Sequence, residues 1–387
     1  MKKDPYNSKE AWNNWKARNP DGVKGISKID SELLMHYLND MEKGFNTSLL
    51  SKKGGRSYIR LNSSRTKLIF LVKSFEERYK IDHIGKLGEE QLIEFFADMR
   101  NGTIRRIDGG IYKSIRDFTK TFKAFWHWYQ KISKKGGIDI PDITVYLDSS
   151  GTKPDWVYLS EAQVKKLCNN ATFDYKALIM FLFDSGIRAP TELVNVKVSD
   201  LYNNYKELNI REETSKTFGR RIKLMLCSDI LKEYVLKNNL KSDDFLFDIS
   251  PPVTNQYLKN LGKRVLGDEM SLAGQKYSDL TMYDFRHCSC CYWLPRYKSE
   301  SALKFRFGWK ESDKIHYYSE MLGMRDTINE DDMLVDLTKT EIERRLEISN
   351  REKEVLLERV SVLELQMKQI SELIKRSQLI VTRTIEN

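Results

Sequence analysis

The most informative stretch of this 387-residue chain is Tyr283-Asp284-Phe285-Arg286-His287. Arg286 offers a planar, permanently charged fork that can hydrogen-bond two phosphate oxygens at once. Four other short motifs carry side chains suited to the same chemistry. They are Ser185-Gly186-Ile187-Arg188, Thr214-Ser215-Lys216-Thr217, Phe307-Gly308-Trp309 and His316-Tyr317-Tyr318-Ser319. Two arginines, a lysine, a ring N–H donor and a phenol can stabilise a pentavalent phosphate and attack it without a metal, so they indicate a DNA phosphodiester as substrate.

Each of these side chains suits one task in phosphodiester chemistry. Arg188 and Arg286 can neutralise the oxygens of the transition state. Lys216 can give a proton to the leaving 5′-hydroxyl. Tyr318 is a weak nucleophile until nearby arginines lower the cost of its phenolate, and it then forms a covalent ester. Because that ester keeps the bond energy, the strand can be rejoined without ATP, and we expect no cofactor.

The excess of positive over negative side chains lies entirely in the N-terminal part of the chain. Residues 1–154 hold 29 Lys and Arg against 19 Asp and Glu, whereas residues 155–334 hold 26 of each and residues 335–387 hold 10 of each. A localised excess is typical of a DNA-binding module, the alternative being a solvated basic surface. We expect the largest contributions to double-stranded DNA binding from Lys52, Lys53, Arg56, Arg116, Lys120 and Lys123.

The cysteines and the hydropathy bear on the cellular setting. The five cysteines show no even spacing, and no signal peptide is apparent, which favours a reducing, cytoplasmic setting. The cluster Cys288-Ser289-Cys290-Cys291 is more typical of small thiols on a buried helix than of a zinc site. No apolar run reaches the length of a membrane span, so we expect a soluble protein.

The hydrophobic spacing predicts a mainly α-helical chain with a small antiparallel β-hairpin, an α+β fold. We expect an N-terminal arm, a helical bundle with basic faces, a linker and a mixed domain at residues 1–28, 29–134, 135–154 and 155–330. In the mixed domain, a buried helix is predicted to end at Gly186. Two strands, 207–211 and 221–226, are predicted to form a hairpin with Lys216 near its tip.

The tail, residues 335–382, has a different pattern. Apolar residues fall on one a/d heptad frame, and charges fill many of the other positions. The frame consists of Ile342, Leu346, Leu356, Val360, Leu363, Met367, Ile370, Ile374 and Val381, with interruptions at Ser349, Lys353 and Ser377. This pattern predicts a coiled coil that could act as an oligomerising stalk. A long helix folded back on its own chain is the alternative.

With these motifs in order, residues 155–325 resemble the catalytic domain of the tyrosine recombinase (phage-integrase) family, and residues 29–134 resemble its helical core-binding domain. The family carries an arginine in Gly-x-Arg, a hairpin lysine, a His-x-x-Arg-His box, a Gly-His or Gly-Trp, and a tyrosine about nine residues later. The matching segments here are Gly186-Ile187-Arg188, Lys216 with the later Arg221-Ile222, Tyr283 to His287, Gly308-Trp309, and Tyr318.

The resemblance implies a role for each matching residue. Arg188 and Arg286 would clamp the non-bridging oxygens of the scissile phosphate, and Lys216 would be the general acid. Trp309 would hydrogen-bond the phosphate through its indole N–H, and Tyr318 would become the 3′-phosphotyrosine. Tyr317 is the competing nucleophile, with packing or steering as its other role.

Two residues depart from the family pattern. Tyr283 replaces the first histidine of the box, which resembles integrases of archaeal viruses and plasmids; its phenol can still hydrogen-bond the phosphate or the nucleophile. Glu192 lies four residues after Arg188 instead of three, which leaves its buttressing role open. For His287, a structural role and a direct role are equally expected.

The resemblance implies a site-specific recombinase that acts as a tetramer on two DNA duplexes. A relaxing enzyme of the type IB topoisomerase kind is the second hypothesis, since it uses similar phosphate chemistry in a monomer. The third is a DNA-binding protein whose site has decayed, with Tyr283 as the mark of decay.

Overall fold

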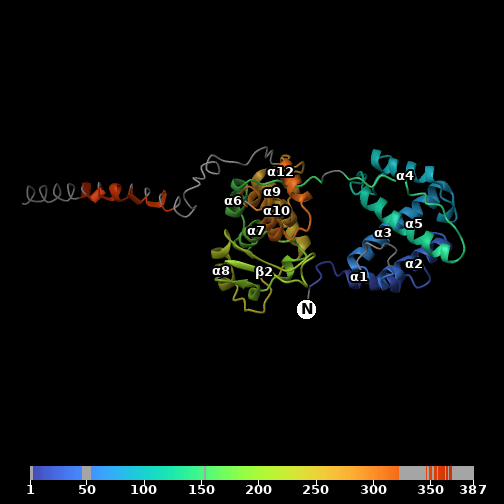
Figure 1. The fold of residues 1–387 in the computed structure, drawn as a ribbon, viewed down its shortest axis with the longest axis horizontal. Helices are drawn as coiled ribbons and strands as arrows, with labels where there is room; N and C mark the ends of the chain where they lie inside the picture. Colours follow the sequence, from blue (N-terminus) through green and yellow to red (C-terminus); the bar gives the residue numbers. More distant parts are fainter. Residues whose placement is uncertain are drawn as a thin grey trace, which may run out of the picture. The chain divides into compact units, whose positions relative to one another are not determined.

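The computed structural model describes residues 3–45, 54–151, 154–297 and 299–321, and in the tail residues 346, 348–350, 353–354, 356–361, 363–364 and 366–367. The chain divides into two units, Met1–Met321 and Leu322–Asn387. The first unit begins with a helical bundle, residues 3–151, and continues with a mixed domain, residues 154–321 (Figure 1).

The bundle consists of amphipathic helices around an aromatic core. Its helices, drawn from blue to green in Figure 1, are α1 (Ser8–Arg18), α2 (Lys28–Lys43), α3 (Tyr58–Tyr79), α4 (Glu89–Asn101) and α5 (Ile115–Lys135), with a 3₁₀ turn at Ile84–Lys86. On α5, Phe122, Phe125 and Trp126 are at most 1% exposed, because helical spacing places them all on the side that faces the core. The Ser27 hydroxyl caps α2 by accepting the Asp30 N–H.

Two segments that we expected to lie outside the bundle belong to it. The N-terminal segment is not a loosely held arm, because Trp12 of α1 is fully buried and its indole N–H donates to the Glu42 carboxylate at 2.9 Å. In the expected linker, Ile143 and Leu147 are 7% and 5% exposed and pack on the bundle core. Both segments contribute apolar side chains to this core, so burial holds them there.

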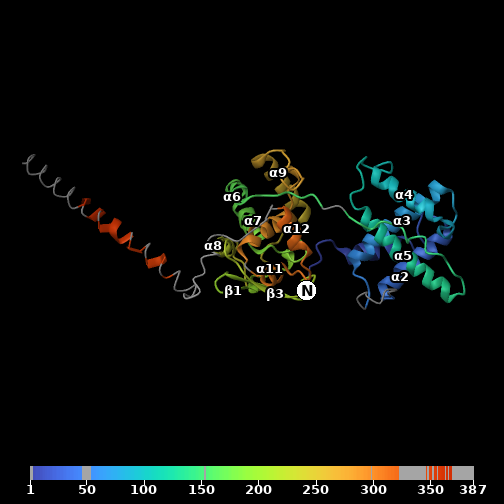
Figure 2. The same cartoon turned by 45° about the horizontal axis from the view of Figure 1, so that its top comes forward.

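The mixed domain combines helices with a small antiparallel sheet. Its helices are α6 (Glu161–Asn170), α7 (Phe173–Ser185), α8 (Ser228–Lys237), α9 (Pro251–Leu266), α10 (Met282–Trp293), α11 (Glu300–Phe307) and α12 (Asp313–Met321). Short 3₁₀ turns lie at Leu193–Asn195, Val198–Asp200, Tyr277–Asp279 and Leu294–Arg296. The strands are β1 (Leu201–Tyr202), β2 (Glu207–Ile210) and β3 (Arg220–Lys223), in the order β1-β2-β3. Figures 1 and 2 show the sheet at one edge of this domain.

The hairpin predicted around Lys216 is confirmed. Strands β2 and β3 pair antiparallel, with Leu208 opposite Ile222 and Ile210 opposite Arg220. β1, which the sequence did not indicate, adds a short third strand by pairing Leu201 with Leu208. The mainly helical fold with a small antiparallel sheet therefore agrees with the α+β expectation.

The predicted helix end at Gly186 is also confirmed. Helix α7 stops at Ser185, and Gly186 adopts φ 58°, a left-handed conformation that favours glycine. A Cβ at this position would lie 2.3 Å from the Phe307 ring, so the position also requires the absence of a side chain. The turn brings Arg188 beside α10, which carries Arg286.

The predicted coiled coil lies mostly outside the described residues. The described tail positions between 346 and 367 are helical. On the predicted frame, Leu356, Val360, Leu363 and Met367 have exposed fractions between 48% and 72%. Within the part of the chain that the structure describes, no helix combines the length and apolar character needed to cross a membrane.

Candidate functional site

The site is built around Arg286, a buried cation on α10. Its side chain is 4% exposed, and its two terminal nitrogens donate to the backbone carbonyls of Gly186 at 2.5 Å and Phe307 at 2.6 Å. Among the described residues, Arg286 forms no ion pair with a carboxylate. Burial, together with the charge of nearby Arg188, lowers the pKa of Arg286 to about 10. A buried cation held by two carbonyl dipoles and the face of the Phe307 ring, without a carboxylate partner among the described residues, is poised to accept an anion.

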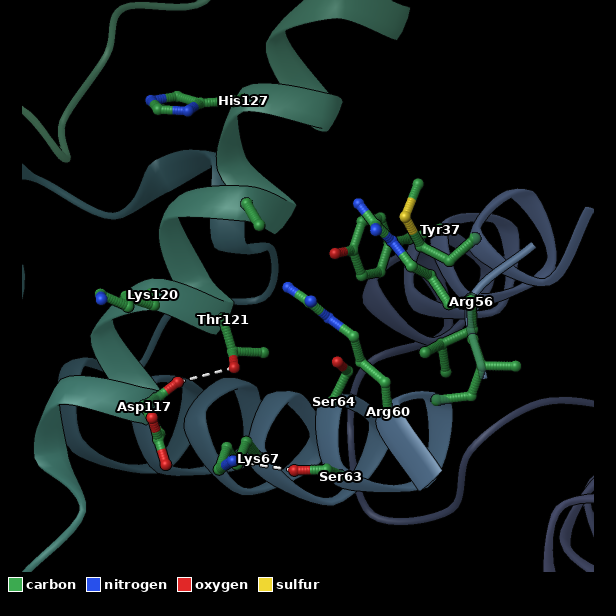
Figure 3. Close-up of a pocket in the computed structure, with 14 residues that line it drawn as sticks. Tyr37, Arg56, Arg60, Ser63, Ser64, Lys67, Asp117, Lys120, Thr121 and His127 are labelled. Carbon is green, nitrogen blue, oxygen red and sulfur yellow. Dashed lines mark hydrogen bonds between the residues drawn. The ribbon is translucent and has the colours of Figure 1, made fainter. Parts of the chain in front are cut away.

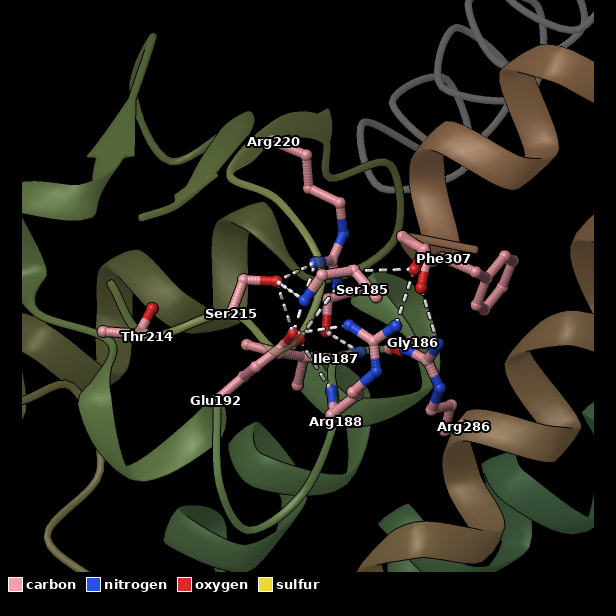
Figure 4. A network of polar contacts seen from close by, with 12 residues as sticks. Ser185, Gly186, Ile187, Arg188, Glu192, Thr214, Ser215, Arg220, Arg286 and Phe307 are labelled. Carbon is pink, nitrogen blue, oxygen red and sulfur yellow. Dashed lines mark hydrogen bonds and ion pairs between the residues drawn. The ribbon is translucent and has the colours of Figure 1, made fainter. Parts of the chain in front are cut away.

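Arg188, near Arg286, belongs to a network centred on Glu192 (Figure 4). Glu192 is fully buried; its Oε1 accepts from Arg188 Nη1 at 2.6 Å and its Oε2 from Arg220 Nη2 at 2.9 Å. Although burial opposes it, the contact with Arg220 and Arg188 lowers the pKa of Glu192 to about 2. Glu192 therefore buttresses Arg188 and Arg220, which settles a role that the sequence left open.

The same network fixes the hairpin that carries Lys216. Arg220 donates through Nε to the Arg306 carbonyl at 2.9 Å, and Thr217 donates to the Gly308 carbonyl at 2.9 Å. The Gly308 carbonyl also accepts from Arg188 at 2.7 Å. Lys216 itself is exposed, and within the described residues its ammonium has no hydrogen-bond or ion-pair partner. The hairpin around Lys216 is therefore fixed by hydrogen bonds, while the Lys216 side chain is free to contact a substrate.

The inward-facing arginine of the hairpin is Arg220, where the family motif suggested Arg221. Arg221 is about half exposed and pairs with Glu207 at 2.5 Å. Side chains alternate between the two faces of a strand, and β3 places Arg220 and Ile222 on its buried face. That alternation, continued through buried Leu224, is the sequence signal that would have identified Arg220.

Tyr318, on α12, lies inside this site. It is 4% exposed, its ring stacks on that of Trp309 with centroids 5.9 Å apart, and its hydroxyl shares a 2.5 Å hydrogen bond with His287 Nδ1. Burial raises the pKa of Tyr318, and the charge of Arg286 opposes that rise. The phenol is therefore protonated, and a phenolate there would depend on positive charge nearby.

His287 has a direct contact with Tyr318. Burial, with a smaller effect of Arg286, lowers the pKa of His287 to about 3, so its imidazole is neutral near neutral pH. Tyr283 is 47% exposed, and its ring meets the His287 ring edge-on at 5.1 Å. The residue that replaces the family histidine thus lies next to the imidazole that contacts Tyr318.

Tyr317, the neighbour of Tyr318, faces different partners. Its hydroxyl accepts the indole N–H of Trp156 at 2.8 Å and donates to the Pro154 carbonyl at 3.3 Å. Trp156 also stacks on His287, with ring centroids 4.7 Å apart. The role of Trp156 was not predicted, because nothing local to residue 156 in the sequence indicates contacts more than 100 residues away.

The arrangement gathers anion-binding and nucleophilic groups in one place. The side chains that could act on a phosphate lie near one another, around the C-terminal ends of α7 and α11 and the first turns of α10: Arg188, Tyr283, Arg286, Trp309 and Tyr318. The hairpin that carries Lys216 is held nearby, because Thr217 donates to the Gly308 carbonyl, which also accepts from Arg188. Such a set can bind a phosphate, attack it and protonate a leaving oxygen. Among the described residues, no group of three or more His, Cys, Asp or Glu side chains is placed to hold a metal ion.

The bundle carries a second candidate surface, a basic groove of about 570 Å³ between α3 and α5 (Figure 3). Arg60, Ser63, Ser64 and Lys67 line one wall at i, i+3, i+4 and i+7 of α3. The other wall belongs to α5 and contains Lys120, with Arg56 beside the groove. Arg60 and Lys67 were not among the predicted DNA-binding residues, although their spacing places both on one face of a helix, which the sequence shows.

The other expected DNA-binding residues are distributed differently. Arg116 lines a separate hollow near the N-terminus of α5 with Arg100 and Lys113. Lys123 is partly buried and acts electrostatically on Asp148. Lys52 and Lys53 lie outside the described residues.

Comparison with solved structures relates this fold to known proteins. The Tn1549 transposon integrase in complex with transposon right end DNA is 14% identical, with 79% of this chain and 97% of that chain covered and a TM-score of 0.54. XerH recombinase in a post-cleavage complex is 12% identical, with 75% and 90% covered and a TM-score of 0.53. A lambda integrase dimer bound to a core site is 15% identical, with 85% of each chain covered and a TM-score of 0.53.

No family model matches the sequence, and no curated protein matches it significantly. At identities this low, the likeness to solved structures concerns the fold alone. The matched structures are tyrosine recombinases, and this chain has the tyrosine recombinase fold.

Proposed function

We propose that this protein is a site-specific DNA recombinase, or integrase, that cleaves and rejoins DNA through a covalent 3′-phosphotyrosine at Tyr318. The observation that supports this most is Arg286, a buried guanidinium beside the buried Tyr318 hydroxyl. A scissile phosphate would supply the counter-charge that Arg286 lacks among the described residues. It would take over hydrogen-bond donors now directed at the Gly186 and Phe307 carbonyls.

In the proposed reaction, the Tyr318 oxygen attacks the phosphorus and the bond from phosphorus to the 5′-oxygen breaks. Arg188 and Arg286 bind the non-bridging oxygens, and the Trp309 indole N–H adds a donor. The phenol proton passes along its hydrogen bond to His287 Nδ1, and the negative charge of the bound DNA phosphate would raise the pKa of this neutral imidazole so that it can accept the proton. Lys216 gives a proton to the 5′-oxygen as it leaves. Rejoining reverses these steps, so no cofactor is consumed.

Tyr318 is the better candidate nucleophile of the two adjacent tyrosines. Its hydroxyl faces His287, and the charge of Arg286 acts on it. The Tyr317 hydroxyl already has a donor and an acceptor, Trp156 and Pro154. Successive helical residues lie about 100° apart, so both hydroxyls cannot reach one phosphate from a docked α12.

The bundle would hold the DNA through its groove. Arg56, Arg60, Lys67 and Lys120 bring four cations to the surface in Figure 3, and the small side chains of Ser63 and Ser64 let a DNA backbone approach α3 closely. Contacts of this kind bind phosphates without regard to sequence. The groove therefore supports DNA affinity, and target choice needs further contacts.

The tail would assemble copies of the chain on DNA. Leu356, Val360, Leu363 and Met367 follow 4-3-4 spacing and are exposed, which suits a coiled coil with a second copy. The double substitution Leu356→Ser and Leu363→Ser should shift the full-length protein toward monomer in sedimentation velocity. Leu357→Ser is the control, since Leu357 is 59% exposed and lies off the frame. Equal oligomerisation of both variants would contradict a coiled-coil stalk.

A nicked half-site DNA that traps the cleaved strand tests the function directly. The intact chain should form a covalent adduct, Tyr318→Phe should form none, and Tyr317→Phe should still form it. Peptide mapping of the adduct to Tyr317 would move the nucleophile by one residue. No adduct from the intact chain would favour a DNA-binding protein without cleavage activity. Adducts without synapsis of two duplexes would favour a monomeric relaxing enzyme.

A further inference from the structure

Trp156 lies near the start of the mixed domain, where hydrogen bonds and burial fix its position. Its backbone N–H donates to the Ala273 carbonyl at 3.0 Å, and its carbonyl accepts from the Ser271 hydroxyl at 3.2 Å. Its side chain is 3% exposed. The indole ring therefore has a fixed position, set by the loop that follows α9.

From that position the indole contacts the surroundings of Tyr318 on three sides. It stacks on the His287 ring at 4.7 Å with an interplanar angle of 25°. It meets the Tyr318 ring edge-on at 6.3 Å. Its N–H donates to the Tyr317 hydroxyl at 2.8 Å, and that hydroxyl donates to the Pro154 carbonyl at 3.3 Å.

These contacts join α12 to the chain that enters its own domain. Because Tyr317 and Tyr318 are adjacent on one helix, fixing Tyr317 also sets the rotation and depth of Tyr318. We propose that Trp156, Pro154 and Tyr317 form a latch that keeps α12 docked in its own subunit, so that Tyr318 attacks the phosphate bound by its own Arg188 and Arg286. This inference rests on the proposed recombinase function and specifies which subunit supplies the nucleophile.

The latch forms only when α12 is docked, because its contacts join Tyr317 of α12 to Trp156 and Pro154. An α12 from another copy could dock only after the resident helix had released Trp156 and Pro154. The latch is also modest, since one hydrogen bond to a neutral partner changes an equilibrium by roughly tenfold. It can bias α12 toward its own site and still allow its release. Trp156 and Tyr317 are positioning residues in this proposal.

A complementation experiment with two full-length variants tests the latch. One variant carries Arg188→Ala and keeps Tyr318, and the other carries Tyr318→Phe and keeps both arginines. A nicked DNA substrate then yields an adduct on the first variant only if its tyrosine attacks a phosphate bound by the second. With the latch intact, this adduct should be scarce. Adding Tyr317→Phe to the second variant should raise it by roughly tenfold, because the resident helix then leaves its site without losing a hydrogen bond, while the incoming helix keeps its own Tyr317.

A second latch variant and a matched control complete the experiment. In the first variant, Trp156→Phe keeps an aromatic ring against His287 and removes the N–H donor that holds its own helix, so it should raise the inter-subunit adduct in the same way. Tyr158→Phe also removes a hydroxyl next to Trp156, whose ring lies 5.9 Å from that of Tyr158, and it should leave the adduct scarce. Thermal melting of each variant reports whether it folds.

The outcomes separate the latch from the function on which it rests. Adducts from the intact chain, together with no increase on Tyr317→Phe or Trp156→Phe, would overturn the latch alone. Abundant inter-subunit adducts with the latch intact would also overturn it. An intact chain that forms no adduct on any nicked substrate would overturn the proposed function, and the latch with it.

Discussion

The core of the bundle is a cluster of aromatic rings, whereas the core of the mixed domain contains a network of charges. In the bundle, Phe122 packs against Phe75 and stacks on Trp126, with ring centroids 5.6 Å and 5.8 Å apart. In the mixed domain, Glu192 and Arg220 pair with both side chains fully buried. The described part of the bundle buries no lysine or arginine, and its basic side chains line a surface groove.

The two regions therefore offer positive charge to an anionic substrate in two ways, from exposed side chains and from buried ones. The bundle folds by apolar burial and keeps its cations in water, so its fold and its proposed DNA contacts involve different residues. The mixed domain buries Arg286 and the network around Glu192, so the same residues hold the fold and form the site. A substitution in the bundle groove should therefore change binding alone, while one in the network should change stability and chemistry together.

The largest expected effect comes from breaking the buried network. Glu192→Ala leaves Arg220 buried without its carboxylate, and removing one partner of a buried ion pair costs about 3–5 kcal/mol of unfolding free energy. Phe122→Ala in the bundle core should cost a similar amount, about 3–5 kcal/mol, by creating a cavity. Urea denaturation measures both, and adduct formation under folding conditions should be impaired only by Glu192→Ala.

The matched control for Glu192→Ala is an exposed ion pair in the same domain. Asp174 pairs with Lys237 at 3.3 Å, and both side chains are more than half exposed. Asp174→Ala should therefore change stability by less than about 1 kcal/mol. A comparable cost for Asp174→Ala and Glu192→Ala would contradict the importance assigned to burial.

The next largest effect distinguishes the rate of adduct formation from the affinity for DNA. Arg286→Lys keeps a positive charge but loses the fork that reaches two oxygens, so the rate of adduct formation should fall roughly 10²- to 10³-fold, as for other lost transition-state donors. DNA affinity in a gel-shift assay should change little, because the bundle groove is untouched. A parallel loss of affinity and rate would mean that the mixed domain, and not the bundle, dominates binding.

A smaller effect concerns pH. The pKa of His287 is about 3 in the folded protein, below its ordinary value of 6.5, so between these values the unfolded chain takes up a proton that the folded chain does not. Stability should therefore fall as pH drops below 6.5, by up to about 1.4 kcal/mol per pH unit, and be insensitive to this group above it. His287→Phe should show a shallower fall between pH 6.5 and 4 in thermal melts. Identical profiles would contradict the buried neutral imidazole.

The smallest effect belongs to single groove residues. Arg60→Gln or Lys67→Gln should each reduce the slope of log affinity against log salt by about 0.9, the value for one lost phosphate contact on duplex DNA, with stability unchanged. Lys73→Gln is the control, since Lys73 lies on another face of α3. An unchanged slope for Arg60→Gln and Lys67→Gln would remove the groove from the DNA-binding surface.

Much of the architecture could be predicted from local patterns. The period-3.6 spacing around Phe122, Phe125 and Trp126 predicted a bundle helix, and alternation on either side of Lys216 predicted the hairpin. Gly186 marked the end of a buried helix because its φ of 58° is one that other residues rarely adopt. The N-terminal arm was predicted wrongly, because the partner that holds Trp12 is Glu42, 30 residues away.

The sequence by itself determined which chemical groups this protein has and the order in which they occur: two arginines, a lysine, a tryptophan and a tyrosine in motifs that each need only a few adjacent residues. The tertiary structure alone decided their partners. That Glu192 pairs with Arg220, that Tyr318 meets His287 and that Trp156 holds Tyr317 depends on contacts between segments 28 to 161 residues apart. Such contacts arise when helices pack and exclude water, so a local pattern of residues cannot specify them.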